Sequence, residues 1–460
     1  MRKLALVSWL LSAACSPADA PDEAQEALEL DVRAELESIP GMTIVSETTS
    51  GQYRFFVLRY RQPVHHWDDT QGTFEQRLTL MHLSESAPTV LVSTGYDIST
   101  RPSRSEPTRL LEANQVTVEH RFFTPSIPSP ANWKRLNVQQ AAADHHRIVT
   151  ALKRRLYRGP WVSTGASKGG MTSVYHRRFY PKDVVATVAY VAPHDVDNAV
   201  DAHTEFLANV GPDPACRTAI ARAQRRALEL RTEMLALLEQ YARDNDVHFV
   251  GGAERALETM VIDTPFLFWQ YGRASNCPNV PREGASASQI YQFLDDTVQV
   301  FAYTHEDADG FVPYYYQAGT QLGYPTLSTA HLDDLLQVPD TQEPKSYVPA
   351  DLPVAYRDLA IRDIDGWVKN KAERIMLIYG EYDPWSAEQF QFGDGTRDSY
   401  RYIVPGGNHG SKIDQLPAAQ RTEAIGKLRA WCGLTRQADE RAIAPGELDV
   451  DEMLQRRPRL

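Results

Sequence analysis

The stretch VSTGASKGGMTSVYH, residues 162–176, places one serine, Ser167, between Gly165 and Gly169. An apolar run ends just before the serine, and a segment able to form a helix begins just after it. Small residues on both sides of a serine allow the backbone to turn sharply from a strand into a helix. The pattern therefore predicts a tight turn that lifts the Ser167 hydroxyl above the edge of a sheet.

Strand-like runs alternate with helical segments on both sides of this turn. Residues 89–95, 115–123 and 184–193 are apolar and suit buried strands, whereas residues 131–156 and 168–180 are suited to helices. Such alternation is typical of a parallel α/β sheet.

Two earlier segments, residues 52–66 and 72–83, are rich in aromatic and β-branched residues and predict a pair of antiparallel strands. Between residues 196 and 348 the strand-like runs become rare, and long segments with helical spacing and many aromatic residues take their place. The α/β pattern then returns. The sequence therefore predicts an α/β core interrupted by an inserted helical cap.

The expected organisation along the chain has six parts. They are a signal peptide at 1–15, an acidic tether at 16–45, core at 46–195, the helical cap at 196–348, core again at 349–435 and a charged tail at 436–460.

A serine hydroxyl is weakly nucleophilic unless a base lies beside it, and an acid normally orients that base. Asp383 follows an apolar strand-like run, and His409 lies in a glycine-rich loop after the next such run. The order serine, acid, histidine is the one expected after such a turn on an α/β sheet. We therefore predict a catalytic triad of Ser167, Asp383 and His409. The alternatives are a packing serine, an ordinary loop histidine, and a capping Asp383 with Glu381 or another acid as the orienting group.

Acyl transfer also needs hydrogen-bond donors for the developing oxyanion. The turn supplies the backbone N–H of Lys168, and we expect the second N–H from Tyr96, in the loop after an earlier strand.

Five motifs carry a resemblance to a known family. GASKGGMTSVYHRRFYP, EHRFF, GTFEQR, GEYDPWS and GGNHGSK resemble the S37 peptidases, secreted bacterial serine aminopeptidases. A more distant similarity extends to the S28 group of prolyl carboxypeptidases and dipeptidyl peptidases. The resemblance implies an α/β-hydrolase fold with a helical cap. It also implies the triad Ser167, Asp383 and His409, and the release of peptides of two or three residues from free N-termini through an acyl-enzyme.

An enzyme that acts at a free N-terminus must recognise a charged amine, which requires a carboxylate near the pocket. Asp97 and Glu119 are the candidates, although Glu119 could instead pair structurally with Arg121 or another base.

The aromatic residues Trp269, Tyr271 and Tyr315 of the cap are candidates for the side-chain pockets, although most aromatic residues of a cap belong to its core. The histidine pairs of the sequence lack a matching carboxylate pattern, so we expect no metal and no cofactor.

The first residues have the pattern of an export signal, with a short basic region, a short apolar run and then Cys15 in a lipobox-like context. The sequence favours a lipoprotein of the outer membrane or cell surface over simple secretion after residue 20. A lipid on Cys15 would be the only expected membrane contact. The formal net charge of −12 argues against nucleic-acid binding, so the expected partners are peptide substrates.

Export permits disulfide formation. Cys216 and Cys277 occupy the same central region and are the predicted pair, which leaves Cys432; three buried free thiols are the alternative.

Two other functions fit the same sequence. An esterase or lipase could use the same triad, since acyl transfer to serine serves both reactions. A surface-anchored binding protein with an inactive hydrolase fold is the third hypothesis, and the intact order of serine, acid and histidine argues against it.

Overall fold

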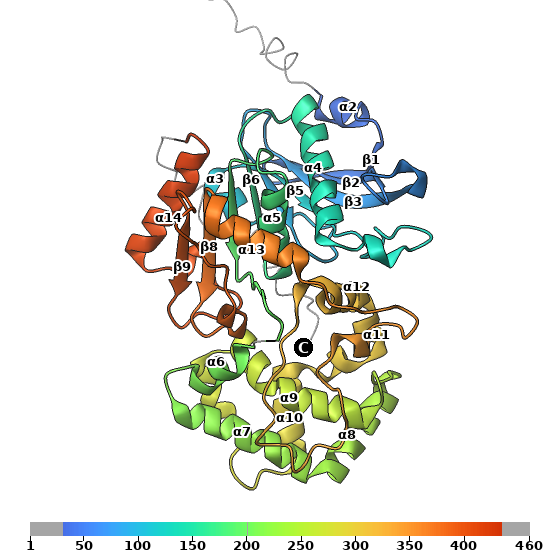
Figure 1. Ribbon diagram of the computed structural model, residues 1–460, viewed down its shortest axis with the longest axis vertical. Coiled ribbons are helices and arrows are strands. Elements are labelled where there is room, and N and C mark those ends of the chain that lie inside the picture. The colour runs from blue at the N-terminus through green and yellow to red at the C-terminus, as the bar shows by residue number, and fades with distance from the viewer. Residues whose placement is uncertain (1–30, 200, 435–460) are drawn as a thin grey trace, which may run out of the picture.

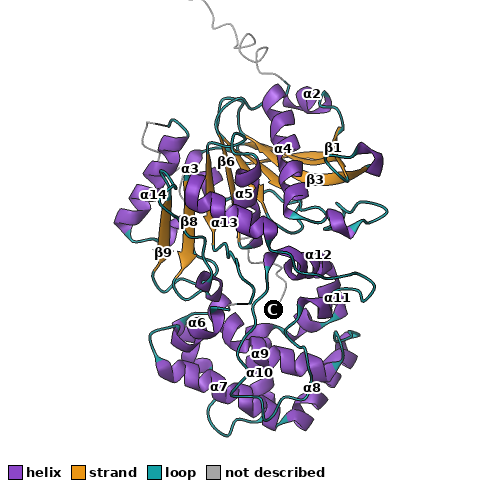
Figure 2. Ribbon diagram, in the orientation of Figure 1, coloured by secondary structure: helices purple, strands orange, loops and turns teal. Residues whose placement is uncertain are grey.

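The computed structural model describes residues 31–199 and 201–434, and its elements are shown in Figures 1 and 2. One sheet of nine strands organises the chain, in the order β1-β2-β3-β5-β4-β6-β7-β8-β9. The strands are β1 (Met42–Ser50), β2 (Tyr53–Pro63), β3 (Thr73–His82), β4 (Thr89–Ser93), β5 (Asn114–Val118), β6 (Trp161–Ala166), β7 (Ala186–Tyr190), β8 (Ile375–Gly380) and β9 (Tyr400–Val404).

The sheet combines an antiparallel and a parallel part. β1, β2, β3 and β5 pair antiparallel, while β5, β4, β6, β7, β8 and β9 run parallel. Parallel neighbours need crossover connections, which helices provide here. The predicted α/β sheet with two antiparallel strands at its start is confirmed.

Helices cover both faces of this sheet. They are α2 (Val32–Glu37), α3 (Glu106–Leu111), α4 (Val138–Arg155), α5 (Lys168–Phe179), α13 (Leu359–Lys371) and α14 (Ala418–Trp431). Alternate residues of one strand face opposite helical layers: Val188 packs in the cluster of α3 and α14, and Ala189 packs with α5 and α13. Burial on both faces explains why the parallel strands are continuous apolar runs in the sequence.

The predicted tether at residues 16–45 is wrong at its C-terminal end. Helix α2 and the start of β1 lie in this range, and Val32, Leu36 and Ile39 are buried in the core under the sheet. The segment was predicted as a tether because it is acidic, but it includes a short amphipathic helix whose apolar side packs against the sheet. The predicted signal peptide, Cys15 and the tail at 436–460 lie outside the described residues.

The chain between β7 and β8 forms the helical cap, which Figure 1 shows gathered below the sheet. Its helices are α6 (His203–Asn209), α7 (Pro214–Glu229), α8 (Arg231–Asn245), α9 (Ala253–Tyr271), α10 (Ala287–Val298), α11 (His305–Ala308) and α12 (Val312–Gln317). The largely apolar α9 is buried along most of its length against its neighbours in the cap core. Helical spacing continues through residues 216–244, but the helix is interrupted at Leu230, where α7 ends and α8 begins.

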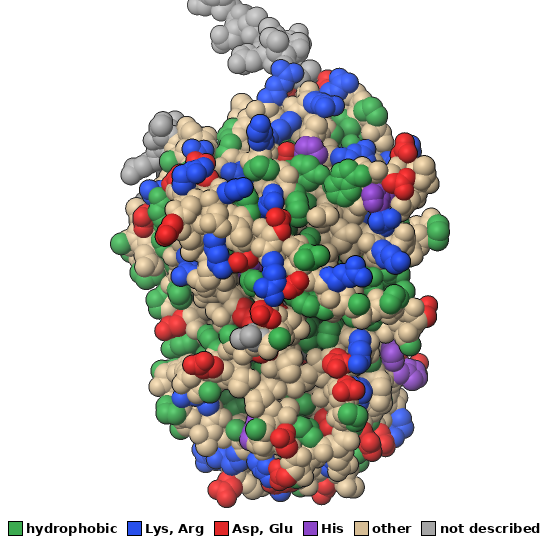
Figure 3. Space-filling view, viewed as in Figure 1, with side chains coloured by type: hydrophobic (Ala, Val, Ile, Leu, Met, Phe, Trp, Pro, Cys, Tyr) green, Lys and Arg blue, Asp and Glu red, His purple; other side chains and the backbone are tan. Residues whose placement is uncertain are grey.

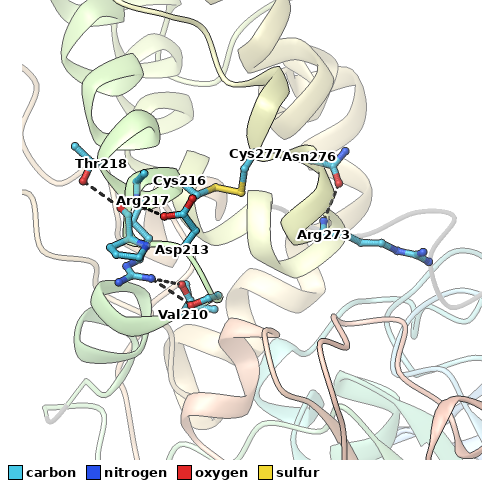
Figure 4. Close-up of a disulfide and its surroundings, with 11 residues drawn as sticks. Val210, Asp213, Cys216, Arg217, Thr218, Arg273, Asn276 and Cys277 are labelled. Atoms are coloured by element: carbon cyan, nitrogen blue, oxygen red, sulfur yellow. Dashed lines mark hydrogen bonds between the residues drawn. A yellow bond between two sulfur atoms is a disulfide. The ribbon is translucent and has the colours of Figure 1, made fainter.

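A disulfide joins Cys216 of α7 to Cys277 in a short 3₁₀ helix after α9 (Figure 4). It closes a loop over 61 positions of sequence, and Cys432 is a buried free thiol. This is the pairing that the sequence predicted.

Acidic and basic side chains are interspersed over the face of the molecule shown in Figure 3. Within the described part of the chain, no helix is both long enough and apolar enough to cross a bilayer.

We predict that replacing both Cys216 and Cys277 by serine lowers the free energy of unfolding by about 2–4 kcal/mol, because a cross-link over a loop of this length restricts the unfolded chain. Denaturant unfolding with and without a reductant measures this. Reduction should destabilise the Cys432→Ala variant, which keeps the disulfide, and should leave the double serine variant unchanged. Equal stability of oxidised and reduced wild-type protein would contradict the prediction.

Candidate active site

Ser167 stands at the turn between β6 and α5, with backbone angles φ 54° and ψ −130°. A positive φ is unfavourable for a residue with a side chain and is found where the surrounding structure enforces it. The side chain makes no capping hydrogen bond to α5, and the serine is 8% exposed. The hydroxyl is therefore held at the end of the strand and not used to build the helix, as the sequence predicted for this turn.

The flanking glycines are required by the closeness of α5 to the sheet. A Cβ on Gly169 would collide with the backbone oxygen of Ser93 in β4, and one on Gly165 would collide with the backbone of Gly169. A Cβ on Gly170 would lie 2.8 Å from the Cβ of Ala192. The glycines thus allow the start of α5 to cross directly over β4 and β6.

Asp383 and His409 meet at the carboxyl edge of the same sheet. Asp383 follows β8 and is fully buried, and His409 lies in the loop after β9. The Nδ1 atom of His409 lies 2.7 Å from Oδ2 of Asp383. Because an ionised carboxylate only accepts, Nδ1 carries the proton and Nε2 presents a lone pair.

Glu381, the alternative orienting acid, is exposed, and its carboxylate accepts the backbone N–H of Gly406. The structure therefore pairs the histidine with Asp383.

The cap holds the histidine loop. The backbone N–H of His409 donates to the carbonyl of Gln270 at 2.9 Å, and the side chain of Asn408 donates to the carbonyls of Tyr271 and Gly272. The rings of Tyr271 and Trp385 flank the imidazole, with centroids 6.2 and 6.4 Å away. The C-terminus of α9 thus fixes the position of the base.

The Nε2 atom of His409 has no hydrogen-bond partner among the described residues. In ligand-free enzymes the bond between nucleophile and base is often long and shortens when substrate binds. The arrangement offers a serine nucleophile, a base with a free lone pair, and a buried acid that fixes the base.

The two predicted oxyanion donors differ in whether their backbone N–H groups already have a partner. Lys168 begins α5, and the first N–H groups of a helix have no partner within it. The backbone N–H of Tyr96, in contrast, donates to Oγ1 of Thr94 at 3.1 Å. The prediction of Tyr96 as a free backbone donor is therefore wrong in this conformation, because the loop folds back on its own threonine; the residue lines the pocket instead.

The side chain of Lys168 has a structural part that the sequence did not suggest. Its Nζ is buried, donates to the carbonyl of Gly95 at 2.5 Å and lies 5.3 Å from the ring centroid of Tyr96. Burial lowers the pKa of this amine to about 7. The lysine therefore ties the start of α5 to the loop after β4.

One pocket contains Ser167. Its walls are largely aromatic and apolar, and besides Lys168 and the tyrosines they include two acids and a histidine: Asp195, Glu388 and His203. Asp195 follows β7 and Glu388 follows the 3₁₀ helix η8 (Pro384–Ala387), so both come from loops at the carboxyl edge of the sheet. Ligands of α/β sheets bind at this edge. Their position after strand-like runs could have marked Asp195 and Glu388 as candidates from the sequence, but they were not among the predicted site residues.

Glu119 is placed away from the pocket lining. Its carboxylate is fully buried and accepts from the guanidinium of Arg77, the hydroxyl of Ser126 and the backbone N–H of Ile98. Burial raises its pKa to about 7. Glu119 therefore forms a structural ion pair, as the alternative interpretation proposed. Its partner is Arg77 and not Arg121, because the Arg121 guanidinium binds Asp144.

Asp97 is half-buried and is also absent from the pocket lining. Neither candidate for amine recognition lines the pocket that contains Ser167.

Of the three predicted pocket aromatics, Tyr271 lines the pocket. Trp269 packs in the cap core with its ring over Gly211, and Tyr315 stacks on Tyr347 at 4.4 Å. Tyr314, the neighbour of Tyr315 on α12, faces the pocket instead. Adjacent helical residues point in different directions, and the sequence could not tell which one faced the serine.

Within residues 31–199 and 201–434, no group of three or more histidine, cysteine, aspartate or glutamate side chains is arranged to hold a metal ion.

The fold and the site together define an α/β-hydrolase with a serine nucleophile. The serine lies with positive φ at a strand-to-helix turn, the acid follows β8 and the histidine follows β9 of the same sheet. Residues 25–453 match the family model described as PS-10 peptidase S37, and the chain belongs to this family. It is a serine exopeptidase of the aminopeptidase type.

Two relatives illustrate the family relationship. The prolyl tri/tetrapeptidyl aminopeptidase of Streptomyces mobaraensis is 46% identical over 454 residues, covering 97% of this chain and 95% of that protein. The lysosomal Pro-X carboxypeptidase of Bos taurus is 24% identical over 355 residues, covering 65% of this chain and 69% of that protein.

We predict that Asp383→Asn lowers kcat on the order of 10⁴-fold, because an amide would favour the wrong histidine tautomer. Steady-state kinetics measure this, and Asp394→Asn, at an exposed site, should retain full activity. Fluorophosphonate labelling should occur in the wild type and be absent in Ser167→Ala. Near-normal turnover by Asp383→Asn would contradict the assignment of the orienting acid.

We also predict that Gly169→Ala destabilises the fold by about 1–3 kcal/mol, because the new methyl group must displace the backbone of β4. Gly426→Ala is the matched control. That glycine is exposed in α14 with open space around it, so alanine should stabilise by about 0.5–1 kcal/mol through helix propensity. Denaturant unfolding measures the free energy of unfolding of both variants, which should change in opposite directions. Equal changes in the two variants would refute the steric argument.

Proposed function

We propose that the protein removes tripeptides or tetrapeptides from the free N-termini of peptides by cleaving after proline. The observation that carries this proposal is the identity of 46%, over nearly the full length of both chains, with an enzyme named a prolyl tri/tetrapeptidyl aminopeptidase. The more distant relative is also named for action at proline. The sequence motifs alone implied two or three residues, and the relative's name favours three or four.

The pocket beside Ser167 is chemically suited to proline. Met171, Tyr96, Tyr314 and Trp385 line it, so a compact apolar ring would be surrounded by apolar and aromatic surface. Aromatic side chains provide large apolar contact areas with few torsions to immobilise.

In the proposed reaction the oxygen of Ser167 attacks the carbonyl carbon of the proline, while Nε2 of His409 takes the hydroxyl proton. Asp383 stabilises the resulting imidazolium. The backbone N–H of Lys168 donates to the oxyanion. The imidazolium then protonates the leaving amine, the C–N bond breaks, and an acyl-enzyme forms. Water activated by His409 releases the peptide acid and restores the serine.

We further propose that the protein is exported, as a lipoprotein through Cys15 or in secreted form. The pattern of the first residues supports this. The Cys216–Cys277 disulfide also supports it, since such bonds persist in oxidising compartments.

A peptide library with proline at positions two to five tests the proposed function. We expect cleavage after proline at positions three and four, detected by mass spectrometry, and at least about a tenfold loss of kcat/KM when the N-terminus is acetylated. A second library with alanine in place of proline is the matched control. Equal cleavage of both libraries would refute the preference for proline, and equal cleavage of free and acetylated peptides would refute the requirement for an N-terminus.

A further inference from the structure

We propose that Asp195, Glu388 and His203 form the binding site for the protonated N-terminal amine of the substrate. The proposal rests on the proposed function, because only a peptide with a free N-terminus brings an ammonium group into the pocket that holds Ser167.

Asp195 presents an unused acceptor. Its Oδ1 atom is buried and has no hydrogen-bond partner among the described residues. Gly323, with φ +85°, leaves the space that the carboxylate occupies, since a Cβ there would collide with Oδ2 of Asp195. The acid is therefore accommodated at the pocket wall, and among the described residues no ion pair joins it to an arginine or lysine.

Glu388 lies beside this acid because two loops are joined. The carbonyl of Glu388 accepts the backbone N–H of His194 at 2.8 Å, and Pro193 bridges Gln389 in antiparallel fashion. These bonds align the loop after β7 with the segment after Asp383. Both carboxylates consequently line one pocket.

His203 supplies a third acceptor. It begins α6, is 2% exposed, and its Nδ1 lies 2.9 Å from Oδ1 of Asp201. That bond places the proton on Nδ1. Nε2 has no hydrogen-bond partner within the described residues, and the residue lines the same pocket. The histidine therefore offers a buried lone pair beside two acids.

An ammonium group has three N–H donors and a positive charge. Two carboxylates and one imidazole lone pair match both properties. Lys168 is the only lysine or arginine among the pocket residues, and its amine is bound to Gly95.

The electrostatic surroundings of Asp195 are consistent with a site for a cation. Burial, together with the charges of Glu388, Asp201 and Asp197, raises the pKa of Asp195 to about 8. An arriving cation would offset that repulsion and favour the ionised carboxylate.

The test compares a chromogenic peptide that ends in proline with its N-acetylated form, on wild type, Asp195→Asn and Glu388→Gln. Asp394→Asn is the control, because it removes an acid that is exposed and lies outside the pocket lining. Removing one partner of a desolvated charge pair should lower kcat/KM for the free peptide about a hundredfold. Turnover of the acetylated peptide should change less than about threefold, since no ammonium group is present. Asp394→Asn should match the wild type.

Fluorophosphonate labelling of Ser167 shows which variants keep an intact active site, because the reagent carries no amine. If Asp195→Asn fails to fold, the turnover of free and acetylated peptide by Glu388→Gln provides the same test. Labelled variants that keep the wild-type ratio of free to acetylated turnover would overturn the amine site and leave the proposed function standing. Equal turnover of both peptides by the wild type would reject the proposed function and the amine site together.

Discussion

The close crossing of α5 over β4 and β6 is the constraint on which the active site depends. It exists because Gly165 and Gly169 have no side chain where the two layers meet. At this crossing Ser167 has a positive φ, its hydroxyl makes no capping hydrogen bond to α5, and the residue lines the pocket. The buried amine of Lys168 then joins the same turn to the loop after β4. The glycine contacts and the lysine hydrogen bond together hold the nucleophile turn against the loop after β4.

The cap and the catalytic base are coupled through main-chain hydrogen bonds. The last carbonyls of α9 accept from the histidine loop through His409 and Asn408. The last carbonyls of a helix lack partners within it, so the cap helix satisfies its own C-terminus by holding the base. The cap therefore limits the pocket and also positions the chemistry. The disulfide lies within the cap, where it joins α7 to the 3₁₀ helix after α9.

The pocket combines an apolar, aromatic wall with two half-buried acids, Asp195 and Glu388. Apolar surroundings make a charged group costly unless a partner arrives. The same burial that raises the pKa of Asp195 would make a substrate ammonium a strongly favoured partner. This combination distinguishes the pocket from an all-apolar cleft suited to simple esters.

The sequence by itself determined the sheet type, the helical insertion and the three catalytic candidates, because these depend on periodicity, order along the chain and short motifs. The sequence favoured the Cys216–Cys277 pair but left three free thiols as the alternative, and the structure shows the disulfide. Apolar runs buried on both faces leave a clear signal, as in β6 and β8. Only the tertiary structure decided which acids reach the pocket. Glu119 looked available in the sequence but is enclosed by Arg77 and Ser126, whereas Asp195 and Glu388 become neighbours through a bridge between loops almost two hundred positions apart. Side-chain direction and long-range loop contacts are set by packing, and no local pattern of residues records them.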